Sequence, residues 1–290
     1  MLLELFSGIG AAGLAWGGPV AAAVDQNPHA NTTYALNHGL RPKAWNLEAV
    51  SAAQLAAFGA TRWWMSPPCQ PYTVRGARRD LDDPRARPLL RLLPILAELR
   101  PPVVAMENVP GFVVSAMRGE LRATLIGAGY TLHERLACPT ALGVPMRRQR
   151  YYLTARLRGD GRHRSELGGS APIAPLRPLG GYLDAAPDPG AYLPEATVRG
   201  YGHSAHIVDA DDPAAVATCF TSAYGRSPVR AGSYVRDAGG VRTFSPEEIL
   251  RLLGFPGSFR FPEGLPRAVR FDLAGNSLSL DAVRAALAEA

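Results

Sequence analysis

Apolar runs alternate with helical stretches through the first half of the 290-residue chain. The apolar runs are short and end in glycine, proline or polar residues, as the strands of a buried sheet do. Strands that alternate with helices are typical of an α/β protein with a doubly wound, mostly parallel sheet. The expected strands are LLELF (2–6), VAAAVDQN (20–27), TRWWMSPP (61–68), PVVAMENV (102–109) and RQRYYLTAR (148–156). One helix is expected to begin at residue 11. Further helices are expected over PHANTTYALNHG (28–39), RPLLRLLPILAELR (87–100) and GELRATLIGAGY (119–130). Pro94 must start or kink the helix in 87–100.

The pattern changes after about residue 158. Residues 158–190 are rich in glycine and proline and have no periodicity, which predicts loops and linkers. Further on, Ser245, Pro246 and Glu248 form the start of a helix, with Ser245 as the N-cap and Glu248 closing a capping box. We therefore expect a main α/β domain at 1–158, a small irregular region at 159–245 and a segment at 246–290 that returns to the main domain.

Cysteine usage and charge limit the classes of function. The three cysteines, Cys69, Cys138 and Cys219, form no CxxC pair, which argues against a disulfide framework and a cysteine-rich zinc site. No metal is expected, and a reducing, cytoplasmic compartment is the simplest interpretation. The net charge of +6 favours a polyanionic partner. The apolar start contains Glu4 and lacks a basic segment, and no other stretch has transmembrane length, so neither a signal peptide nor a membrane span is expected.

Three loops follow expected strands at their carboxyl ends: SGIGAAG (7–13), PPCQP (67–71) and ENVPG (107–111). Ligands of open α/β sheets bind at that edge, so we expect the three loops to converge on one site. Gly8, Gly10 and Gly13 match the GxGxxG pattern, and Asp25 ends the next strand, where a carboxylate can bind a ribose hydroxyl. A nicotinamide dinucleotide and S-adenosylmethionine both fit this pattern. A tight turn without a ligand is the alternative.

Cys69 and Glu107 favour one of these cofactors. Pro67, Pro68 and Pro71 make a stiff loop around Cys69, because proline fixes φ and donates no backbone hydrogen bond. A cysteine nucleophile near a carboxylic acid suits addition to an electron-poor ring, whose nitrogen the acid can contact as charge develops. Hydride transfer needs no such cysteine. Taken singly, the two residues could also be a buried cysteine next to a turn and a solvated carboxylate.

Five segments together resemble the cytosine-5 methyltransferases of nucleic acids. They are ELFSGIGAAG, similar to the cofactor motif, SPPCQP, similar to the nucleophile motif, MENVPGF, similar to the acid motif, VPMRRQRYYL, similar to the arginine motif, and AGNSLSL (274–280), similar to the closing asparagine motif. Their order and spacing fit, and the resemblance spans both ends of the chain. It implies a Rossmann-like methyltransferase domain at 1–158 that uses S-adenosylmethionine, and a small target-recognition region at 159–245.

The resemblance implies a role for each matching residue. Cys69 would add to carbon 6 of cytosine, and Glu107 would contact ring N3 and the exocyclic amine. Arg148 and Arg150 would help to hold the base and its backbone; a surface strand rich in arginine is the alternative. The target base must leave its stack to reach Cys69. The positions that match cofactor contacts are Phe6, Gly8, Ile9, Gly10, Asp25, Gln26, Asn46, Leu47, Pro68, Asn276 and Ser277, and those that match substrate contacts are Gln70, Cys219, Phe220 and Thr221.

Finer details resemble one branch of the family, which methylates the anticodon loop of aspartate tRNA. They are TCFTSAYG (218–225), CPTALGVP (138–145), TFSPEEILRLLGFPGSFRFP (243–262), and Met146 where DNA enzymes usually carry glutamine. WNLE (45–48) departs from the usual third cofactor motif, because Asn46 replaces an acid, whereas Glu48 fits this branch. A small recognition region suits RNA that is read by shape and by unstacked loop bases. Cys219 lies either near the active site or packed as a structural cysteine.

A tRNA cytosine-5 methyltransferase is therefore the leading hypothesis, and the resemblance implies a monomer. The nearest alternative is a DNA cytosine-5 methyltransferase of a restriction-modification system. An inactive nucleic-acid-binding relative is a further alternative, against which the intact Cys69, Glu107 and Asn276 argue. A nicotinamide dehydrogenase would explain GxGxxG but none of the other four motifs.

Overall fold

The structure, a computed structural model, describes residues 1–73, 79–158, 163–167, 174–224, 226 and 231–288. The chain folds into two compact units, each assembled from separated segments: Met1–Ala137, Gln149–Gly169 and Val283–Ala290 in the first, and Cys138–Arg148 and Ser170–Ala282 in the second. The expected division of the chain at residues 158 and 245 stays a prediction. Within the described residues, no helix is long and apolar enough to cross a membrane.

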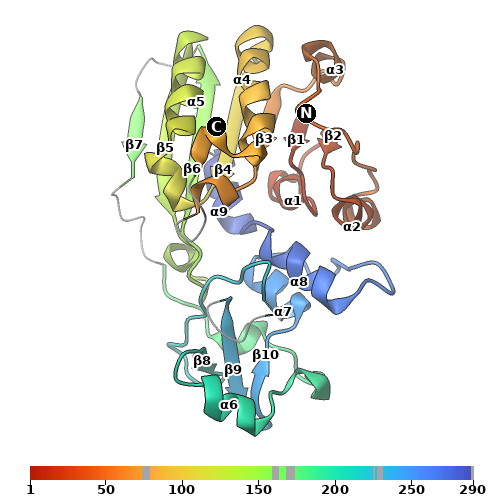
Figure 1. Cartoon of the computed structure of the whole chain (residues 1–290), viewed down its shortest axis with the longest axis vertical. Coiled ribbons are helices and arrows are strands. Elements are labelled where there is room, and N and C mark those ends of the chain that lie inside the picture. The colour runs from red at the N-terminus through yellow and green to blue at the C-terminus, as the bar shows by residue number, and fades with distance from the viewer. Residues whose placement is uncertain (74–78, 159–162, 168–173, 225, 227–230, 289–290) are drawn as a thin grey trace. The chain divides into compact units, whose positions relative to one another are not determined.

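The first unit is built around a seven-stranded sheet with the strand order β2-β1-β3-β4-β6-β5-β7 (Figure 1). Strands β1 to β4 pair in parallel, β6 is antiparallel to both β4 and β5, and β7 is parallel to β5. This mostly parallel sheet confirms the predicted fold class. The strands are β1 (Leu2–Leu5), β2 (Val20–Val24), β3 (Arg62–Met65), β4 (Val103–Asn108), β5 (Tyr130–Ala137), β6 (Arg150–Leu157) and β7 (Arg164–Glu166).

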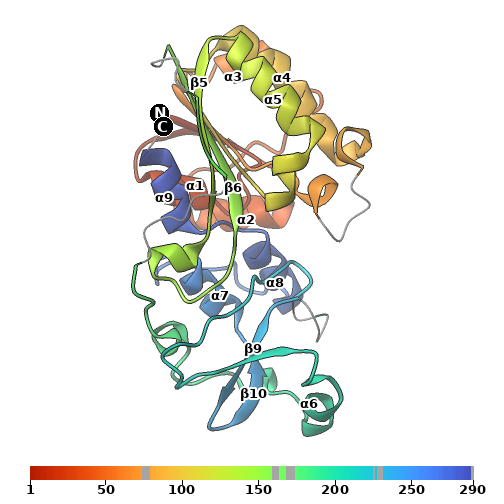
Figure 2. The ribbon, with the colours of Figure 1, turned by 90° about the vertical axis from the view of Figure 1, so that its left-hand side faces the viewer.

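Helices cover both faces of this sheet, with α4 and α5 on one face and α1 on the other (Figure 2). Because successive side chains of a strand point to opposite faces, Leu3 and Leu5 of β1 join the large apolar core that includes α4 and α5. Glu4, between them, contacts α1 on the opposite face. The helices of this unit are α1 (Ala11–Trp16), α2 (Pro28–His38), α3 (Ala52–Ala56), α4 (Arg87–Leu99) and α5 (Ala116–Gly127).

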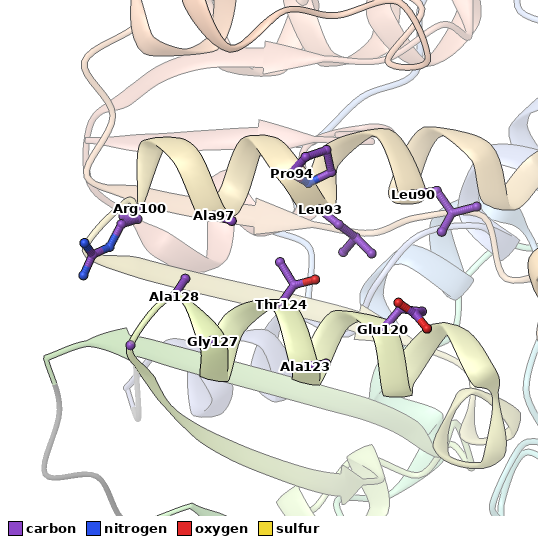
Figure 3. Close-up of a pocket in the computed structure, with 11 residues that line it drawn as sticks. Leu90, Leu93, Pro94, Ala97, Arg100, Glu120, Ala123, Thr124, Gly127 and Ala128 are labelled. Carbon is purple, nitrogen blue, oxygen red and sulfur yellow. The ribbon is translucent and has the colours of Figure 1, made fainter.

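Most of the predicted elements of this unit are present, whereas the sequence does not predict β5, α3 and β7. Strand β7 lies in the stretch 158–190, so the prediction of loops alone is wrong there, because pairing with β5 holds these residues in the sheet. Helix α4 contains Pro94 in its interior, so of the two expected alternatives, a helix start or a kink at Pro94, the start is excluded. Pro94 is exposed and, with Leu90 of the preceding turn, lines a surface groove of about 790 Å³ between α4 and α5 (Figure 3). None of the predicted site residues lines this groove.

The second unit contains a three-stranded sheet with the order β10-β9-β8. Strand β9 is parallel to β8 and antiparallel to β10. In its core, the ring of Tyr224 packs edge to face against Phe220 and Phe271. Its strands are β8 (His206–Asp209), β9 (Ser233–Asp237) and β10 (Gly240–Thr243), and the remaining helices are α6 (Glu195–Tyr201), α7 (Pro246–Leu252), α8 (Arg267–Gly275) and α9 (Leu280–Ala288), whose last residues belong to the first unit.

The predicted capping box at the start of α7 is confirmed. The Oγ of Ser245 accepts the backbone N–H of Glu248 at 3.0 Å, and the Glu248 carboxylate accepts the backbone N–H of Ser245 at 2.7 Å. The same carboxylate is fully buried and receives two N–H groups of Arg242 in β10, at 2.9 and 3.0 Å. The first turn of α7 is thus joined to β10 by a buried ion pair between Glu248 and Arg242.

Candidate active site

The loop with Cys69 follows β3 at the carboxyl edge of the sheet. Pro68 lies in this loop, and Cys69 begins a 3₁₀ turn in which the backbone N–H of Tyr72 donates to the Cys69 carbonyl at 2.9 Å. Cys69 and Pro68 are partly buried, whereas Gln70 is exposed. Because prolines donate no backbone hydrogen bonds, the loop keeps its shape through this turn and through contacts with neighbouring segments.

Asn108 joins this loop to the next strand. Its Nδ2 donates to the carbonyl of Pro67 at 3.2 Å. Gly111 packs against the same loop, because an added Cβ there would lie 2.1 Å from the carbonyl oxygen of Tyr72. Strands β3 and β4 pair in parallel, so their carboxyl ends lie at the same edge. The Cys69 loop and the segment after Glu107 are therefore fixed to each other.

Glu107 lies near the end of β4 with its carboxylate beside an arginine. Its Oε1 lies 3.1 Å from Nε of Arg150, the first residue of β6, which is the antiparallel neighbour of β4. The side chains of Glu107 and Arg150 are 9% and 15% exposed, so the ion pair is mostly shielded from water. Opposite charges attract more strongly in such a shielded place than in water. A carboxylate held in this way can contact the ring nitrogen of a base.

The turn between β1 and α1 has a backbone that favours glycine. Gly8 and Gly10 have φ of +53° and +89°, and Phe6, partly buried, has φ of +58° although it is not a glycine. Such conformations cost a residue with a side chain about 1–3 kcal/mol and cluster at ligand sites. A Cβ on Gly8 would meet no atom of the described residues within 4 Å, so the described part of the chain leaves open space there. Ile9 is buried, and the buried Oγ of Ser7 has no hydrogen-bond partner within the described residues.

Asp25 supports this turn from the end of β2. Its Oδ2 accepts the backbone N–H of Gly8 at 2.8 Å, and its Oδ1 accepts that of Asn27 at 2.8 Å. Burial raises the pKa of the Asp25 carboxyl, and these backbone hydrogen bonds act in the opposite direction. The carboxylate therefore lies where the pattern of the sequence places a ribose-binding group, and it also orders the glycine turn.

Asn46 organises the neighbouring segment. Its Oδ1 accepts Nε2 of Gln26 and the backbone N–H of Glu48, both at 2.9 Å. Lys43 forms a parallel bridge with the end of β2, which brings this segment beside Gln26. Leu47 is buried in the core, whereas Gln26 is exposed. The asparagine that departs from the usual motif thus connects two of the segments expected to hold the cofactor.

Arg148 connects the predicted residues of the second unit. It is 5% exposed, and its Nη1 lies 3.2 Å from the carbonyl oxygen of Phe220 and 3.3 Å from Sγ of Cys219. Its Nη2 donates to the carbonyls of Gly275, at 3.2 Å, and Ser277. One guanidinium group therefore bridges the TCFT and AGNSLSL segments.

The same two segments are in direct backbone contact. A Cβ added to Gly275 would lie 2.5 Å from the carbonyl carbon of Thr221, so a side chain would force the segments apart. Asn276 follows as the exposed C-cap of α8. The Oγ of Ser277 is buried and has no hydrogen-bond partner among the residues that the structure describes.

The predicted site residues therefore form two groups, one in each unit. The first group contains Cys69, Gln70, Glu107, Arg150, Phe6, Gly8, Ile9, Gly10, Asp25, Gln26, Asn46, Leu47 and Pro68, and the second contains Arg148, Cys219, Phe220, Thr221, Asn276 and Ser277. Within the described part of the chain, no three His, Cys, Asp or Glu side chains gather as metal ligands would.

Sequence reasoning misses two residues that support these segments. Asn108 holds the Cys69 loop, and the fully buried Glu4 accepts the backbone N–H of Gly13 at 2.8 Å. The signal for Asn108 is an amide directly after the acid at a strand end. The signal for Glu4 is a single charge inside an otherwise apolar strand.

The fold, the glycine turn and the cysteine and glutamate at adjacent strand ends define a class of methyltransferases. Residues 1–168 match the family model described as C-5 cytosine-specific DNA methylase, and the chain belongs to the C-5 cytosine methyltransferase family.

Three relatives are similar to nearly the whole chain. The tRNA (cytosine(38)-C(5))-methyltransferase of Schizosaccharomyces pombe is 31% identical, over 97% of this chain and 94% of its own. The structure of the Entamoeba histolytica methyltransferase EhMeth has a TM-score of 0.88 and 26% identity, covering 99% of this chain and 96% of its own. The structure of a Spodoptera frugiperda DNMT2 mutant has a TM-score of 0.87 and 28% identity, covering 99% of this chain and 98% of its own.

Proposed function

We propose that this protein transfers a methyl group from S-adenosylmethionine to carbon 5 of a cytosine in tRNA, through a covalent bond between Cys69 and carbon 6. The observation that carries this proposal is the hydrogen bond from Asn108 to Pro67, which holds the Cys69 loop beside the strand end of Glu107. A nucleophile and an acid fixed at adjacent strand ends can act together on one flat ring.

In the proposed mechanism, the thiolate of Cys69 donates an electron pair to carbon 6, and electron density moves onto carbon 5. Glu107, as the carboxylic acid, donates its proton to ring N3, where negative charge develops, and its other oxygen accepts from the exocyclic amine; Arg150 holds the carboxyl group in place. Carbon 5 takes the methyl group and then loses its proton to a base. The electron pair of the broken carbon–hydrogen bond forms the carbon 5–carbon 6 double bond. The sulfur leaves carbon 6 with its own bonding pair as the thiolate, and N3 returns its proton to Glu107.

S-adenosylmethionine supplies the activated methyl group when bound. The open space at Gly8, the unpartnered Oγ of Ser7 and the carboxylate of Asp25 fit a small polar ligand at the carboxyl edge of the sheet. The residues of the first unit proposed to hold it are Phe6, Gly8, Ile9, Gly10, Asp25, Gln26, Asn46, Leu47 and Pro68. For Asn276 and Ser277 a cofactor contact stays a prediction from the resemblance.

The proposed substrate is tRNA, and more narrowly the anticodon loop of aspartate tRNA. The name of the Schizosaccharomyces pombe relative and the resemblance of TCFT (218–221) to the tRNA branch support this choice. Gln70, Cys219, Phe220 and Thr221 are the proposed substrate contacts. Unstacked loop bases can enter a pocket without breaking base pairs. DNA is the second candidate, because the matching family model describes a DNA methylase.

The substrate is tested with methyl-labelled S-adenosylmethionine, total tRNA and mixed-sequence duplex DNA. We expect label in tRNA from the wild type and none from Cys69→Ala, and sequencing of the labelled tRNA then identifies the cytosine. Label in DNA alone would replace the proposed substrate and leave the chemistry intact. Label in neither nucleic acid would contradict the proposed activity.

The covalent step is tested with RNA that contains 5-fluorocytosine. Fluorine on carbon 5 cannot leave as a proton does, so the cysteine adduct persists after methyl transfer. We expect a stable protein–RNA complex whose modified peptide contains Cys69. An adduct on Cys138 or Cys219 would refute the assignment of the nucleophile.

A further inference from the structure

Glu4 is a carboxylic acid in the middle of β1 that the proposed chemistry does not use. Its Oε1 accepts the backbone N–H of Gly13 at 2.8 Å, and its Oε2 accepts the hydroxyl of Tyr34 at 2.5 Å. Its side chain has no exposed surface, so Glu4 cannot contact a bound ligand. A buried carboxylate is costly unless its oxygens receive hydrogen bonds, and both oxygens receive one here.

Tyr34 extends this contact from Glu4 towards the glycine turn. It is fully buried in α2, and its ring stacks on His38 with 4.1 Å between the ring centroids. The Nε2 of His38 lies 3.4 Å from the carbonyl oxygen of Ile9. The imidazole also fills the space beside Gly10, where an added Cβ would lie 2.1 Å from Nε2.

Glu4, Tyr34 and His38, here called the turn support, therefore contact the glycine turn (7–13) at Gly13, Gly10 and Ile9. Helix α1 has no side-chain cap of its own, because Gly10 occupies the N-cap position. Glu4 supplies from β1 the acceptor that a capping residue would supply to the first turn.

We propose that Glu4 is a positioning residue, which acts through Tyr34 and His38 to fix the glycine turn in the shape that binds the cofactor. The inference rests on the proposed function. Loss of the Tyr34 hydroxyl would leave one carboxylate oxygen buried without its donor and would loosen the packing of His38 against the turn. Cofactor affinity should fall although no group that touches the cofactor is removed.

The chain offers a matched control for this test. Tyr151 is also fully buried in the first unit, and its hydroxyl donates to the buried Glu134 at 2.6 Å. Tyr34→Phe and Tyr151→Phe each remove one hydroxyl from a buried glutamate, and of these two tyrosines only Tyr34 belongs to the turn support. Binding of S-adenosylhomocysteine is measured by calorimetry on both folded variants, with thermal melting as the measure of stability.

We expect Tyr34→Phe to weaken S-adenosylhomocysteine binding at least fivefold relative to Tyr151→Phe at a similar loss in melting temperature. Glu4→Gln, which keeps an oxygen for Gly13 and an amide for Tyr34, should recover most of the affinity that Glu4→Leu loses. Equal affinities of the two tyrosine variants would overturn the inference.

Hydrogen exchange of the ligand-free protein separates this inference from the proposed function. We expect faster exchange in the peptide that covers residues 6–16 in Tyr34→Phe, and wild-type exchange in Tyr151→Phe. A wild type that does not bind S-adenosylhomocysteine would refute the proposed cofactor, while exchange would still report on the turn support. Unchanged exchange in Tyr34→Phe would overturn the inference.

Discussion

Arg148 and Arg150 lie two positions apart, and their guanidinium groups have different surroundings. Arg150 pairs with Glu107 beside the proposed nucleophile loop, whereas Arg148 contacts the backbone carbonyls of Phe220, Gly275 and Ser277. The resemblance implies that both hold the base. The contacts of Arg148 instead support a positioning role, in which it fixes the segment that carries Asn276.

Arg148→Lys is expected to lower the free energy of unfolding by about 2 kcal/mol, because a lysine cannot reach several carbonyls with one planar fork. Arg150→Lys, at a more exposed ion pair, is expected to cost less than about 1 kcal/mol. Both should reduce methyl transfer. Urea unfolding measures the difference, and an Arg148→Lys variant as stable as the wild type would contradict the positioning role.

Because the carboxyl of Glu4 is buried, we expect the stability of the fold to depend on pH. Burial raises the pKa of Glu4 from 4.5 to about 7, against the hydrogen bonds from Tyr34 and Gly13. Because the folded pKa lies above the unfolded value, the stability that Glu4 contributes is fully present below pH 4.5 and is lost as the pH rises through 7. Glu4→Gln cannot titrate. Its stability relative to the wild type should therefore rise by about 3 kcal/mol between pH 4.5 and pH 8.

Denaturant unfolding at several pH values measures this difference. Among the groups that face the carboxyl, Tyr34 has its pKa raised by burial and so stays neutral across this range. A difference between Glu4→Gln and wild type that does not change with pH would show that Glu4 is equally protonated in the folded and unfolded chains.

Short motifs carry local signals in the sequence, whereas the residues that support them do not. Cys69 and the glycines of the turn carry their own signals, because proline and glycine restrict or free the backbone locally. The hydrogen bond from Asn108 to Pro67 joins residues 41 positions apart, and that from Tyr34 to Glu4 joins residues 30 positions apart. Such pairings depend on the packing of strands and helices, which no local pattern encodes.

At the scale of elements, β5 shows why a strand escapes prediction. Tyr130 and Leu132 point into the core as an alternating pattern requires, but the next inward residue is the fully buried Glu134. Its charge is balanced by Arg118 and Arg122 of α5. An inward acid breaks the apolar alternation, so the strand becomes recognisable only when its partners are known.

Pro94 makes α4 less stable than its apolar pattern would allow. Proline has no N–H, so the carbonyl of Leu90, one turn earlier, loses its helical hydrogen bond. Pro94→Ala restores that bond and is expected to raise the free energy of unfolding by about 2 kcal/mol, after the gain in unfolded-chain entropy is subtracted. Chemical denaturation measures the change.

Pro88, in the first turn of α4, is the matched control. The N–H groups of a first turn have no partner within the helix, so Pro88→Ala restores no hydrogen bond. We expect it to change stability by less than about 1 kcal/mol. Equal effects of the two substitutions would contradict the role assigned to the missing N–H of Pro94.

At the scale of the whole molecule, the excess positive charge belongs to one unit. The segments of the first unit carry 19 basic and 13 acidic side chains, whereas those of the second carry 12 of each. The unit with the proposed nucleophile therefore also supplies the net attraction to phosphate. The net charge of +6 can be counted from the sequence alone, but the structure is needed to assign the charges to a unit.

This distribution predicts that binding of tRNA depends strongly on salt and that binding of the cofactor does not. Each phosphate neutralised by the protein releases counterions. We expect tRNA affinity to fall more than about tenfold between 50 and 200 mM salt, and S-adenosylhomocysteine affinity to change less than about twofold. Filter binding and calorimetry measure the two, and tRNA binding that is insensitive to salt would contradict the electrostatic contribution.

The place of β6 in the sheet has a consequence for biosynthesis. Strand β4 ends at Asn108, and its sheet neighbour β6 begins only at Arg150. At roughly 5–20 residues per second, the ribosome needs a few seconds to make the stretch between them. Until then, β4 has an open edge with which other chains can pair. In the folded protein this strand is buried along its whole length. We therefore expect nascent chains that end before Arg150 to aggregate or bind chaperones, and longer chains to escape this fate once β6 emerges.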